Sequence, residues 1–469
     1  MPNPLDIQVR GARWYALPVK TRLPLKFGRD TLTEVVCARV CLTVSRASDG
    51  QRAEGWGETP LSVQWVWPSS LSYELRLQVL KDFCQVLAQA YAQFPARGHA
   101  LEIGAVFLHT ALPKLLAAFN QSLPPHVVLP HLAALVCASA FDLALHDAYG
   151  VVHEVPTYQT YTTPWLNHDL SAYLTPANDC PEVSFTGRYP VHYFRPTIPA
   201  ELLAWHLVGG LDYLTIAEAG QNRLNDGHPS SLDEWIARDG LKALKIKLRG
   251  NDAAWDYQRL VAVARLALPL GVELFTADFN CTVTDPAYVN EILDRVKIEL
   301  PELWQKLRYV EQPFPYELAD YPIDVHSVSQ RCPLFLDESA HDWHWVRRGR
   351  ELGWTGVALK TCKTQTGALL SLCWAQAHGM ELMVQDLTNP MLAQVTHLLL
   401  AAHAPTIAGV ETNGMQFYPE ASAVEAKVHP ELYQRREGKV RLNSLHGPGF
   451  GYRLSEIEQS LPQPQSIWP

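Results

Sequence analysis

The sequence predicts an α/β fold, a (β/α)8 (TIM-type) barrel preceded by an N-terminal α+β domain. Two observations lead to this prediction. From Leu241 onward, short apolar runs alternate with segments of helical spacing, which is typical of βα units around a parallel sheet. The first 150 residues instead hold apolar, β-branched runs followed by stretches rich in Leu and Ala, an order that is typical of an α+β domain.

Length and composition agree with this fold and exclude several classes of protein. The chain has 469 residues, of which 47% are hydrophobic, and its formal net charge is −9. It shows no basic stripe for nucleic acid and no apolar run near the roughly 18 residues of a membrane helix, so we expect neither partner. The nine cysteines form no CxxC pair and the N-terminus has no apolar signal region, which predicts a cytoplasmic protein with reduced thiols.

Residues 1–150 are predicted to form the N-terminal domain. Residues 1–60 are expected to be strands, because Val35–Val44 is apolar and rich in β-branched residues. Gly55–Pro60 follows, and its glycines predict a tight turn at a strand end. Helices are expected next, since the sequence becomes rich in Leu, Ala and Gln; they cover 70–118 and Leu132–Tyr149.

Two further segments flank the predicted barrel. Residues 151–240 are rich in proline and form a connecting segment or insertion with few regular elements. This segment is either a surface insertion or a functional one that covers a binding site or contacts another subunit. Residues 431–469 are expected to return to the N-terminal domain.

The barrel itself is assigned to residues 241–430. Helical segments are expected at Asp252–Leu268 and Ala368–His378, between predicted strands. An eighth strand is expected near Leu211–Ile216. The other seven are Ala243–Leu248, Glu273–Phe279, Leu307–Val310, Pro333–Leu336, Gly356–Leu359, Glu381–Val384 and Thr406–Val410.

Polar or charged residues stand at the ends of these seven strands. The carboxyl ends of barrel strands face the mouth of a barrel, so these side chains are expected to meet there. Side chains alternate along a strand, so Lys245 and Lys247 share one face. The strand-end residues are Lys245, Lys247, Asp278, Asn280, Glu311, Asp337, Glu338, Lys360, Asp386 and Glu411.

This ring of residues suggests a chemistry. The carboxylates of Asp278, Glu311 and Asp337 would repel one another unless a hard cation lay between them, and Mg²⁺ (or Mn²⁺) suits such oxygen ligands. A lysine near such a cation can act as a neutral base. The set could therefore remove a proton α to a carboxylate, with the metal stabilising the enediolate and a lysine accepting the proton.

Each of these charged residues, taken alone, also has an explanation that involves no chemistry. A lone KxK on a strand is usually surface charge, and a lone acid at a strand end usually caps a helix or forms a salt bridge. From Lys247 onward, however, the charged strand ends follow one another at gaps of 31, 33, 26 and 23 residues. Each gap suits one βα unit, so the ordered combination favours a site.

The sequence resembles the enolase superfamily in its muconate-lactonizing-enzyme subgroup, within the mandelate racemase and muconate lactonizing enzyme family. The resemblance covers much of the chain and implies an N-terminal α+β capping domain over the barrel. It rests on Gly55–Leu61 (GWGETPL), Ser139–Gly150 (SAFDLALHDAYG), Leu244–Arg259 (LKIKLRGNDAAWDYQR), Tyr309–Pro313 (YVEQP) and Leu336–Ser339 (LDES).

The resemblance implies roles for the strand-end residues. Asp278, Glu311 and Asp337 would bind the metal, with Asn280 and Glu338 beside them. Lys247 and Lys360 would be acid/bases on opposite faces of the substrate, and Lys245 would tune Lys247 or contact the substrate carboxylate. Capping-domain loops near Leu23–Gly28 and Thr59–Trp67 would shape specificity, and the stretch QWVWP within the second loop is either a substrate lid or packing.

Three departures from the subgroup leave alternatives open. The segment Lys360–Gly367 is longer than usual and lacks a Gly pair, so Lys363 competes with Lys360 as the second base. Glu411 and Asn413 stand where dipeptide epimerases carry an Asp-x-Asp, which weakens a dipeptide assignment. Asp386 and Asn389 predict a more polar substrate. Substrate contacts are therefore assigned to Lys363, Asp386, Asn389, Glu411 and Asn413.

Three functions are consistent with the sequence. The first is a Mg²⁺-dependent racemase or epimerase acting on a small-molecule carboxylate, since a lysine on each face can deliver a proton to its own side. The second is a lyase of the same superfamily, catalysing an o-succinylbenzoate synthase-like dehydration, a cycloisomerisation or an acid-sugar dehydration. The third is a barrel that binds a carboxylate or a partner without catalysis. A homo-oligomer is expected in each case.

Overall fold

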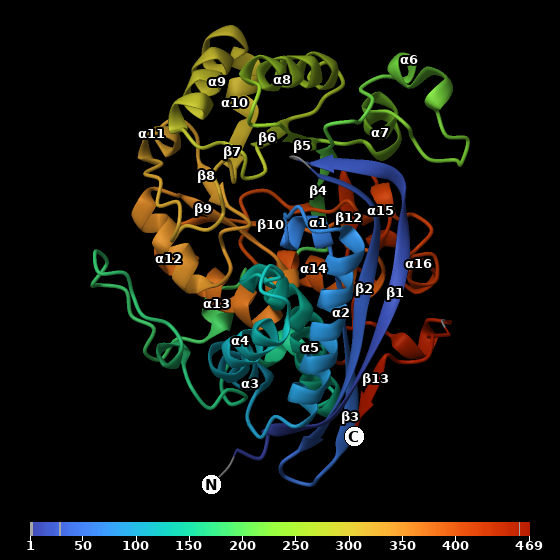
Figure 1. Cartoon of the computed structure of the whole chain (residues 1–469), viewed down its shortest axis with the longest axis vertical. Coiled ribbons are helices and arrows are strands. Elements are labelled where there is room, and N and C mark those ends of the chain that lie inside the picture. Colours follow the sequence, from blue (N-terminus) through green and yellow to red (C-terminus); the bar gives the residue numbers. More distant parts are fainter. Residues whose placement is uncertain (1–2, 28–29, 459) are drawn as a thin grey trace.

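The structure is a computed structural model that describes residues 3–27, 30–458 and 460–469. Two domains are visible, an α+β domain built on long blue strands and a larger barrel domain (Figure 1). The α+β domain contains a four-stranded sheet in the order β13-β1-β2-β3, whose pairs are all antiparallel. Its strands are β1 (Ile7–Phe27), β2 (Asp30–Arg46), β3 (Arg52–Pro60) and β13 (Ser466–Trp468). The pairing of β13 with β1 brings the C-terminal end of the chain back to this capping domain.

Helices cover one face of this sheet. The central helix α5 is almost wholly buried, because apolar residues lie on all of its sides. By length and composition, α5 and the stretch 100–122 could each cross a membrane, but 94% of the α5 window is buried inside the protein, so α5 is a core helix. The helices are α1 (Val63–Val66), α2 (Tyr73–Ala92), α3 (Ala100–Val106), α4 (Leu112–Ser122) and α5 (His131–Val152), with a π-helical turn at Phe107–Ala111 between α3 and α4.

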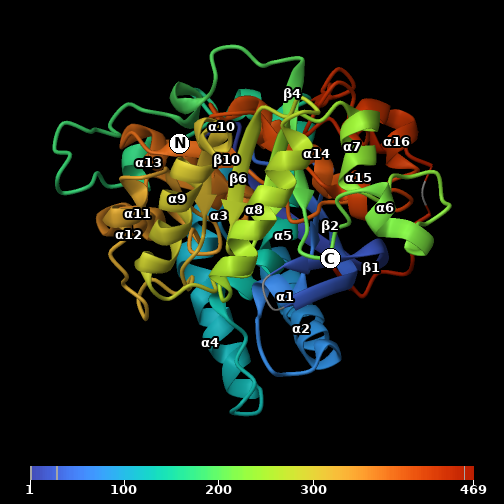
Figure 2. The same cartoon turned by 90° about the horizontal axis from the view of Figure 1, so that it is seen from above.

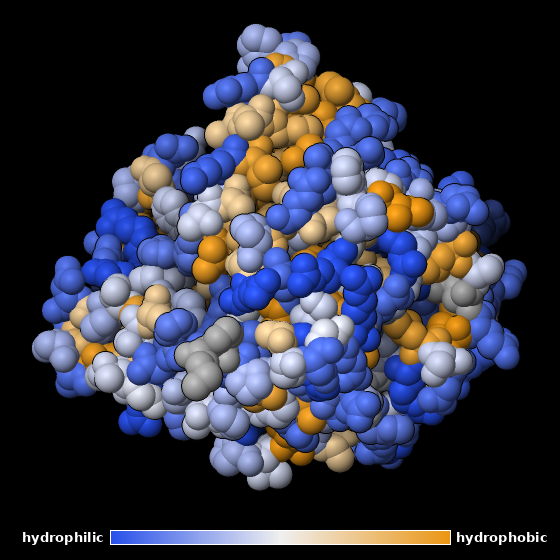
Figure 3. Space-filling view, turned by 90° about the horizontal axis from the view of Figure 1, so that it is seen from below, coloured by the Kyte–Doolittle hydropathy of each residue, from blue (hydrophilic) through white to orange (hydrophobic). Residues whose placement is uncertain are grey.

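Helix α4 projects from the body of the capping domain (Figure 2). Only Leu112 of this helix is buried, and Leu115, Leu116 and Phe119 are half-buried against the capping-domain core. The face seen from below is mainly hydrophilic, with apolar residues gathered beneath the projection at the top of the picture (Figure 3).

The prediction of a tight turn at Gly55–Pro60 is wrong, because these residues continue strand β3. The glycines are explained by the approach of α5 to the sheet. A Cβ on Gly55 would lie 2.0 Å from the backbone N of Ala148, and a Cβ on Gly57 would lie 2.2 Å from the carbonyl oxygen of Ala140. Glycine here therefore permits close helix–strand packing.

Gly55→Val is expected to destabilise the protein by about 3 kcal/mol or more, because the new side chain would overlap helix backbone, which cannot move away as a flexible side chain can. Glu54→Val is the control, since this neighbouring side chain is largely exposed. Denaturant unfolding of both variants measures the difference. Equal stability of the two variants would contradict the packing argument.

The barrel domain contains eight parallel strands that curl around one another in the order β10-β9-β8-β7-β6-β5-β4-β11. The backbone N–H of Ile407, just before β11, donates to the carbonyl of Leu382 in β10 at 2.9 Å and helps to join the two ends of the sheet. The strands are β4 (Glu201–Val208), β5 (Ala243–Lys247), β6 (Leu274–Asp278), β7 (Leu307–Glu311), β8 (Leu334–Leu336), β9 (Gly356–Leu359), β10 (Glu381–Val384) and β11 (Val410–Glu411); β12 (Lys439–Arg441) pairs antiparallel with β4. The predicted fold class is confirmed.

The eighth strand differs from its expected position. It is β4 (Glu201–Val208), and the segment 211–216 is not a strand. Leu211 and Ile216 are exposed, whereas most of β4 is buried. β4 lies between Pro199 and Gly209 within the proline-rich segment, and that composition conceals a short strand.

Helices surround the parallel sheet (Figures 1 and 2). Two predicted helices are present, at α8 and α13, with ends that shift by up to three residues. The helices are α6 (Ile216–Ala219), α7 (Leu232–Asp239), α8 (Ala253–Ala267), α9 (Pro286–Glu299), α10 (Pro301–Lys306), α11 (His326–Ser329), α12 (Trp343–Leu352), α13 (Gln365–Ala377), α14 (Met391–His403), α15 (Gly414–Phe417) and α16 (Glu425–Val428).

The chain between α5 and β4 contains only short 3-10 turns. Tyr158 stacks on His403 at the C-terminal end of α14, with 3.8 Å between ring centroids. The backbone N–H of Ala177 donates to His378 at the end of α13. These two contacts lie at the C-terminal ends of α13 and α14. The hydroxyls of Tyr158 and Tyr161 also accept from Gln365 at the start of α13, so the segment contacts both ends of that helix.

Candidate active site

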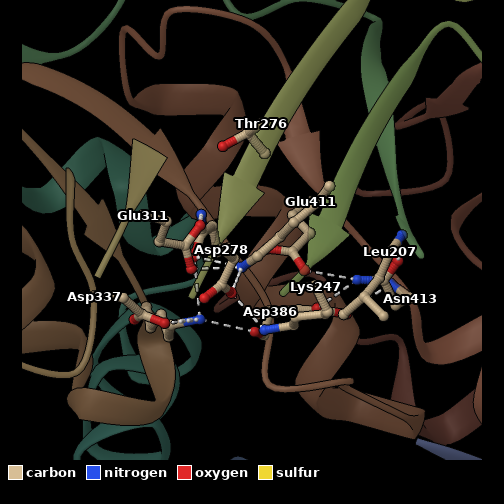
Figure 4. Close-up of polar contacts among 12 residues, drawn as sticks. Leu207, Lys247, Thr276, Asp278, Glu311, Asp337, Asp386, Glu411 and Asn413 are labelled. Atoms are coloured by element: carbon tan, nitrogen blue, oxygen red, sulfur yellow. Dashed lines mark hydrogen bonds and ion pairs between the residues drawn. The ribbon is translucent and has the colours of Figure 1, made fainter. Parts of the chain in front are cut away.

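The strand ends bring the predicted lysines and carboxylates together in one buried cluster (Figure 4). Lys245, on β5, lies at its centre. Its Nζ is 2.5 Å from Glu311 Oε1, 3.0 Å from Glu411 Oε2 and 3.2 Å from Asp278 Oδ2. One ammonium group therefore bridges carboxylates from β6, β7 and β11.

Two further lysines flank this centre. The Nζ of Lys247 donates to Asp278 Oδ2. The Nζ of Lys360 lies 3.2 Å from Asp337 Oδ2 and donates to the carbonyl of Asp386 at 3.1 Å. Because β6, β7 and β8 lie between β5 and β9 in the sheet, Lys247 and Lys360 approach from different sides.

A small cavity of about 40 Å³, partly open to solvent, lies between these lysines and the capping domain. Lys360 lines this cavity and also a smaller one beside α13. Lys363 lines the smaller one and donates to the carbonyl of Asp337 at 2.6 Å. Geometry therefore favours Lys360 over Lys363 as the group that meets a substrate. The lining residues are Leu25, Leu32, Ser62, Trp65, Leu207, Lys245, Lys247, Asp337, Lys360, Asp386, Leu387, Thr388 and Glu411.

Burial and charge shift the ionisation of these groups. Burial lowers the pKa of Lys245, but Glu311, Glu411 and Asp278 outweigh it and raise that pKa well above its ordinary value. Burial also lowers the pKa of Lys360, but Asp337, Glu411 and Glu311 together outweigh it and raise that pKa. Burial and the neighbouring Lys360 lower the pKa of Lys363, against the opposing effect of Asp337.

The pKa values of the carboxyl groups are also shifted in both directions. Burial raises the pKa of Asp278 and Asp337, but the lysines beside each outweigh it, so both values are lowered. Burial raises the pKa of Glu311 well above its ordinary value. Burial together with Asp337 and Asp278 raises the pKa of Glu338 to about 7.

The donor set suits a hard divalent cation. Asp278, Glu311 and Asp337 supply carboxylate oxygens from three neighbouring strand ends, and Asp337 Oδ1 is buried without a hydrogen-bond partner. Two buried negative charges would stay unbalanced if every group of the cluster were ionised, because six carboxyls (Asp278, Glu311, Asp337, Glu338, Asp386 and Glu411) face four lysines (Lys245, Lys247, Lys360 and Lys363).

The present side-chain positions do not form a closed metal site. Among the described residues, no three His, Cys, Asp or Glu side chains form a group that could hold a metal ion. The ammonium group of Lys245 occupies the space between the carboxylates instead. A cation would bind here only if the lysines gave up part of these contacts.

Asn280 and Glu338 lie beside the carboxylates, as expected. The backbone N–H of Asn280 donates to Asp278 Oδ1 at 2.9 Å, and its own side-chain oxygen is buried without a partner. Glu338 Oε1 accepts a hydrogen bond from Trp65 Nε1 at 2.8 Å. This last contact ties the capping domain to the end of β8.

The five residues predicted to contact substrate separate into two groups. Asp386 and Glu411 line the cavity, whereas Lys363, Asn389 and Asn413 do not. Asn413 accepts from the backbone of Leu207 and donates to Glu411 Oε1 at 2.9 Å. The side chain of Asn389 accepts from the backbone of Leu387, so it holds the loop.

The capping domain completes the cavity. Leu25 and Leu32 come from the hairpin of β1 and β2, Ser62 immediately precedes α1, and Trp65 lies on α1. Both predicted specificity loops thus reach the cavity; Gly28 of the first loop lies outside the described residues. Trp65 also lies over Lys360, with its ring centroid 5.5 Å from Nζ, which favours the lid interpretation.

Sequence reasoning missed two contributors. Leu207 lines the cavity from β4, the strand that was expected elsewhere. Tyr309 accepts a hydrogen bond from Gln385, which also donates to Glu311 Oε2 at 2.5 Å. The polar residue Gln385 at the end of a strand was a usable signal, whereas Tyr309 looks like any apolar strand residue.

The fold and site define a two-domain protein in which an α+β domain covers a (β/α)8 barrel with lysines and carboxylates at its strand ends. Residues 230–458 match the family model described as enolase C-terminal domain-like. The resemblance seen in the sequence is confirmed. No curated protein sequence matches the chain.

Solved structures show the same fold over nearly the whole chain. N-succinyl Arg/Lys racemase from Bacillus cereus ATCC 14579 has a TM-score of 0.62 and 16% identity, covering 98% of this chain and 99% of that one. Dipeptide epimerase from Enterococcus faecalis V583, complexed with Mg and a dipeptide, has a TM-score of 0.61 and 15% identity, covering 95% of this chain and 99% of that one. Muconate lactonizing enzyme from Pseudomonas fluorescens, complexed with muconolactone, has a TM-score of 0.61 and 14% identity, covering 97% of each chain.

Proposed function

We propose that the protein is a Mg²⁺-dependent racemase or epimerase that removes the proton α to the carboxylate of a small substrate. The observation that supports this most directly is the placement of Lys247 and Lys360 on different sides of one cavity, with Asp337 and Glu411 also lining it. The solved structures with this fold include a racemase and an epimerase.

Asp278, Glu311 and Asp337 would hold the cation. A bound Mg²⁺ would supply a Lewis acid that stabilises the negative charge developing on the substrate when the α-proton leaves. Lys247 accepts the proton from one face, and Lys360 delivers a proton to the other face. The raised pKa of Lys360 makes its resting form the ammonium, which is the form that donates. Trp65, Leu25 and Leu32 supply the apolar part of the cavity wall.

A lyase is the second candidate, and one observation favours it. Asp337 keeps Lys360 cationic, so Lys360 could hold negative charge without transferring a proton while Lys247 alone acts as base. Such a reaction changes the mass of the substrate by one water or closes a ring. Racemisation and epimerisation leave the mass unchanged.

Exchange of the α-proton in D₂O tests the proposal. The protein is incubated with Mg²⁺ and pooled N-acyl amino acids, dipeptides, hydroxy acids and acid sugars, and deuterium uptake is read by mass spectrometry. Chelator-sensitive exchange on any compound is expected, with unchanged product mass for a racemase or epimerase. A lack of exchange across the pool, combined with no calorimetric Mg²⁺ binding, would refute the proposal and favour a non-catalytic barrel.

A further inference from the structure

A buried chain of hydrogen bonds crosses from the capping domain to the barrel. The carboxylate of Asp142, on α5, accepts the backbone N–H and the hydroxyl of Thr366, both at 2.8 Å. His146 Nε2 lies 2.9 Å from Thr366 Oγ1, and its Nδ1 lies 2.8 Å from the hydroxyl of Tyr161. All four side chains are fully buried, so no water replaces a lost contact.

The direction of this chain follows from its chemistry. The Thr366 hydroxyl gives its proton to Asp142, so its oxygen accepts from His146 Nε2–H. Burial lowers the pKa of His146 to about 3, so the ring is neutral and its Nδ1 accepts from Tyr161. Every donor therefore points toward Asp142, and the carboxylate anchors the whole chain.

Thr366 belongs to the first turn of α13, immediately after the segment that carries Lys360. A 3-10 turn at Thr361–Lys363 joins Lys360 to this helix. Thr364 adopts a φ of +77°, which is uncommon for a β-branched residue, and its hydroxyl accepts from the N–H of Gly367 at 3.0 Å. The turn is therefore held at both ends, by β9 and by the start of α13.

Close packing leaves little room for this helix start to move. A Cβ on Gly104, in α3, would lie 2.2 Å from Thr366 Oγ1 and 2.6 Å from Asp142 Oδ1. Among the residues that the structure describes, the turn that follows Lys247 forms no such hydrogen-bonded link to the capping domain. That turn is held within the barrel by Asp256, which accepts the N–H groups of Arg249 and Gly250 at 2.7 and 2.8 Å.

We propose that Asp142 is a positioning residue for Lys360, acting through Thr366 and the Thr361–Lys363 turn, so that docking of the capping domain aligns one of the two acid/bases but not the other. This inference rests on the proposed function. Asp142 does not line the cavity and contacts none of its carboxylates, so its effect on the chemistry passes through Thr366 and the turn that carries Lys360.

The test compares Asp142→Asn with Asp147→Asn. Asp147 lies on the same helix, is also buried, and also accepts two backbone N–H groups, from Trp56 and Phe450, but does not contact α13. Deuterium exchange is measured separately from each enantiomer of a substrate. Asp142→Asn is expected to slow exchange on the Lys360 face by about 10- to 100-fold and to leave the Lys247 face within about threefold. Asp147→Asn is expected to affect both faces alike.

Amide hydrogen exchange provides a readout that does not depend on activity. Asp142→Asn is expected to speed exchange over 361–367, and Asp147→Asn is not. If Asp142→Asn fails to fold, Thr366→Val removes the hydroxyl and Thr366→Ser is expected to restore it. Equal slowing of both faces, or unchanged amide exchange over 361–367, would overturn the inference. An inactive wild-type protein with the expected amide pattern would refute the proposed function and leave the positioning contact supported.

Discussion

Lys247→Ala and Lys360→Ala are each expected to lower racemisation by about 10²- to 10⁴-fold, the range that one positioned acid or base contributes. Each lysine serves one face of the substrate, so loss of either one stops inversion. Exchange of the α-proton, measured on one enantiomer at a time, should respond differently from racemisation. Each variant should lose exchange on one face and keep it on the other, because the remaining lysine still removes the proton it faces.

Two lysines provide the controls for this experiment. Lys242 lies just before β5, is half-buried and donates to the carbonyl of Gly271. The Lys242→Ala variant should therefore exchange the substrate α-proton normally. Lys363→Ala separates the two candidates for the second base. Since Lys363 does not line the cavity, its loss should cost less than the loss of Lys360. Normal racemisation by both Lys247→Ala and Lys360→Ala would contradict the two-lysine mechanism.

The positions of the charged strand ends could be predicted because two independent patterns coincide there. Short apolar runs mark the strands, and the first polar residue after each run marks its carboxyl end. Asp278, Glu311 and Asp337 were found in this way, and the structure brings them to one lysine-bridged cluster. β4 escaped the same reasoning because prolines precede it and it ends at a glycine pair rather than a charged residue.

What the sequence could not show is the direction of side chains in irregular backbone. Lys360 and Lys363 are three residues apart, and only the 3-10 turn between them decides that one meets the cavity and the other bonds to a carbonyl. Likewise, Asp386 lines the cavity, whereas the side chain of Asn389 accepts from the backbone of its own loop. Neighbouring polar residues in a loop share a composition but not an orientation, since loop orientation depends on tertiary hydrogen bonds.

Asp337→Asn is expected to weaken Mg²⁺ binding by at least about 100-fold and α-proton exchange by a similar or larger factor. The substitution keeps the shape of the side chain but removes one negative charge from a cluster whose carboxyls outnumber its lysines. It also removes the negative charge that pairs with Lys360, whose Nζ lies 3.2 Å from Asp337 Oδ2. Calorimetric titration with MgCl₂ measures the first effect independently of any substrate.

Asp386→Asn is the matched control, because Asp386 lines the same cavity and is equally buried, yet its oxygens accept backbone N–H groups of Asn389 and Asn413. Asp386→Asn should change the Mg²⁺ affinity by no more than a few-fold relative to the wild-type protein. If both variants lost Mg²⁺ equally, the cation would depend on the total charge of the cavity rather than on the donor set from β6, β7 and β8. If neither did, the lysines of this barrel would neutralise its carboxylates without a metal, and the proton chemistry would need another source of charge stabilisation.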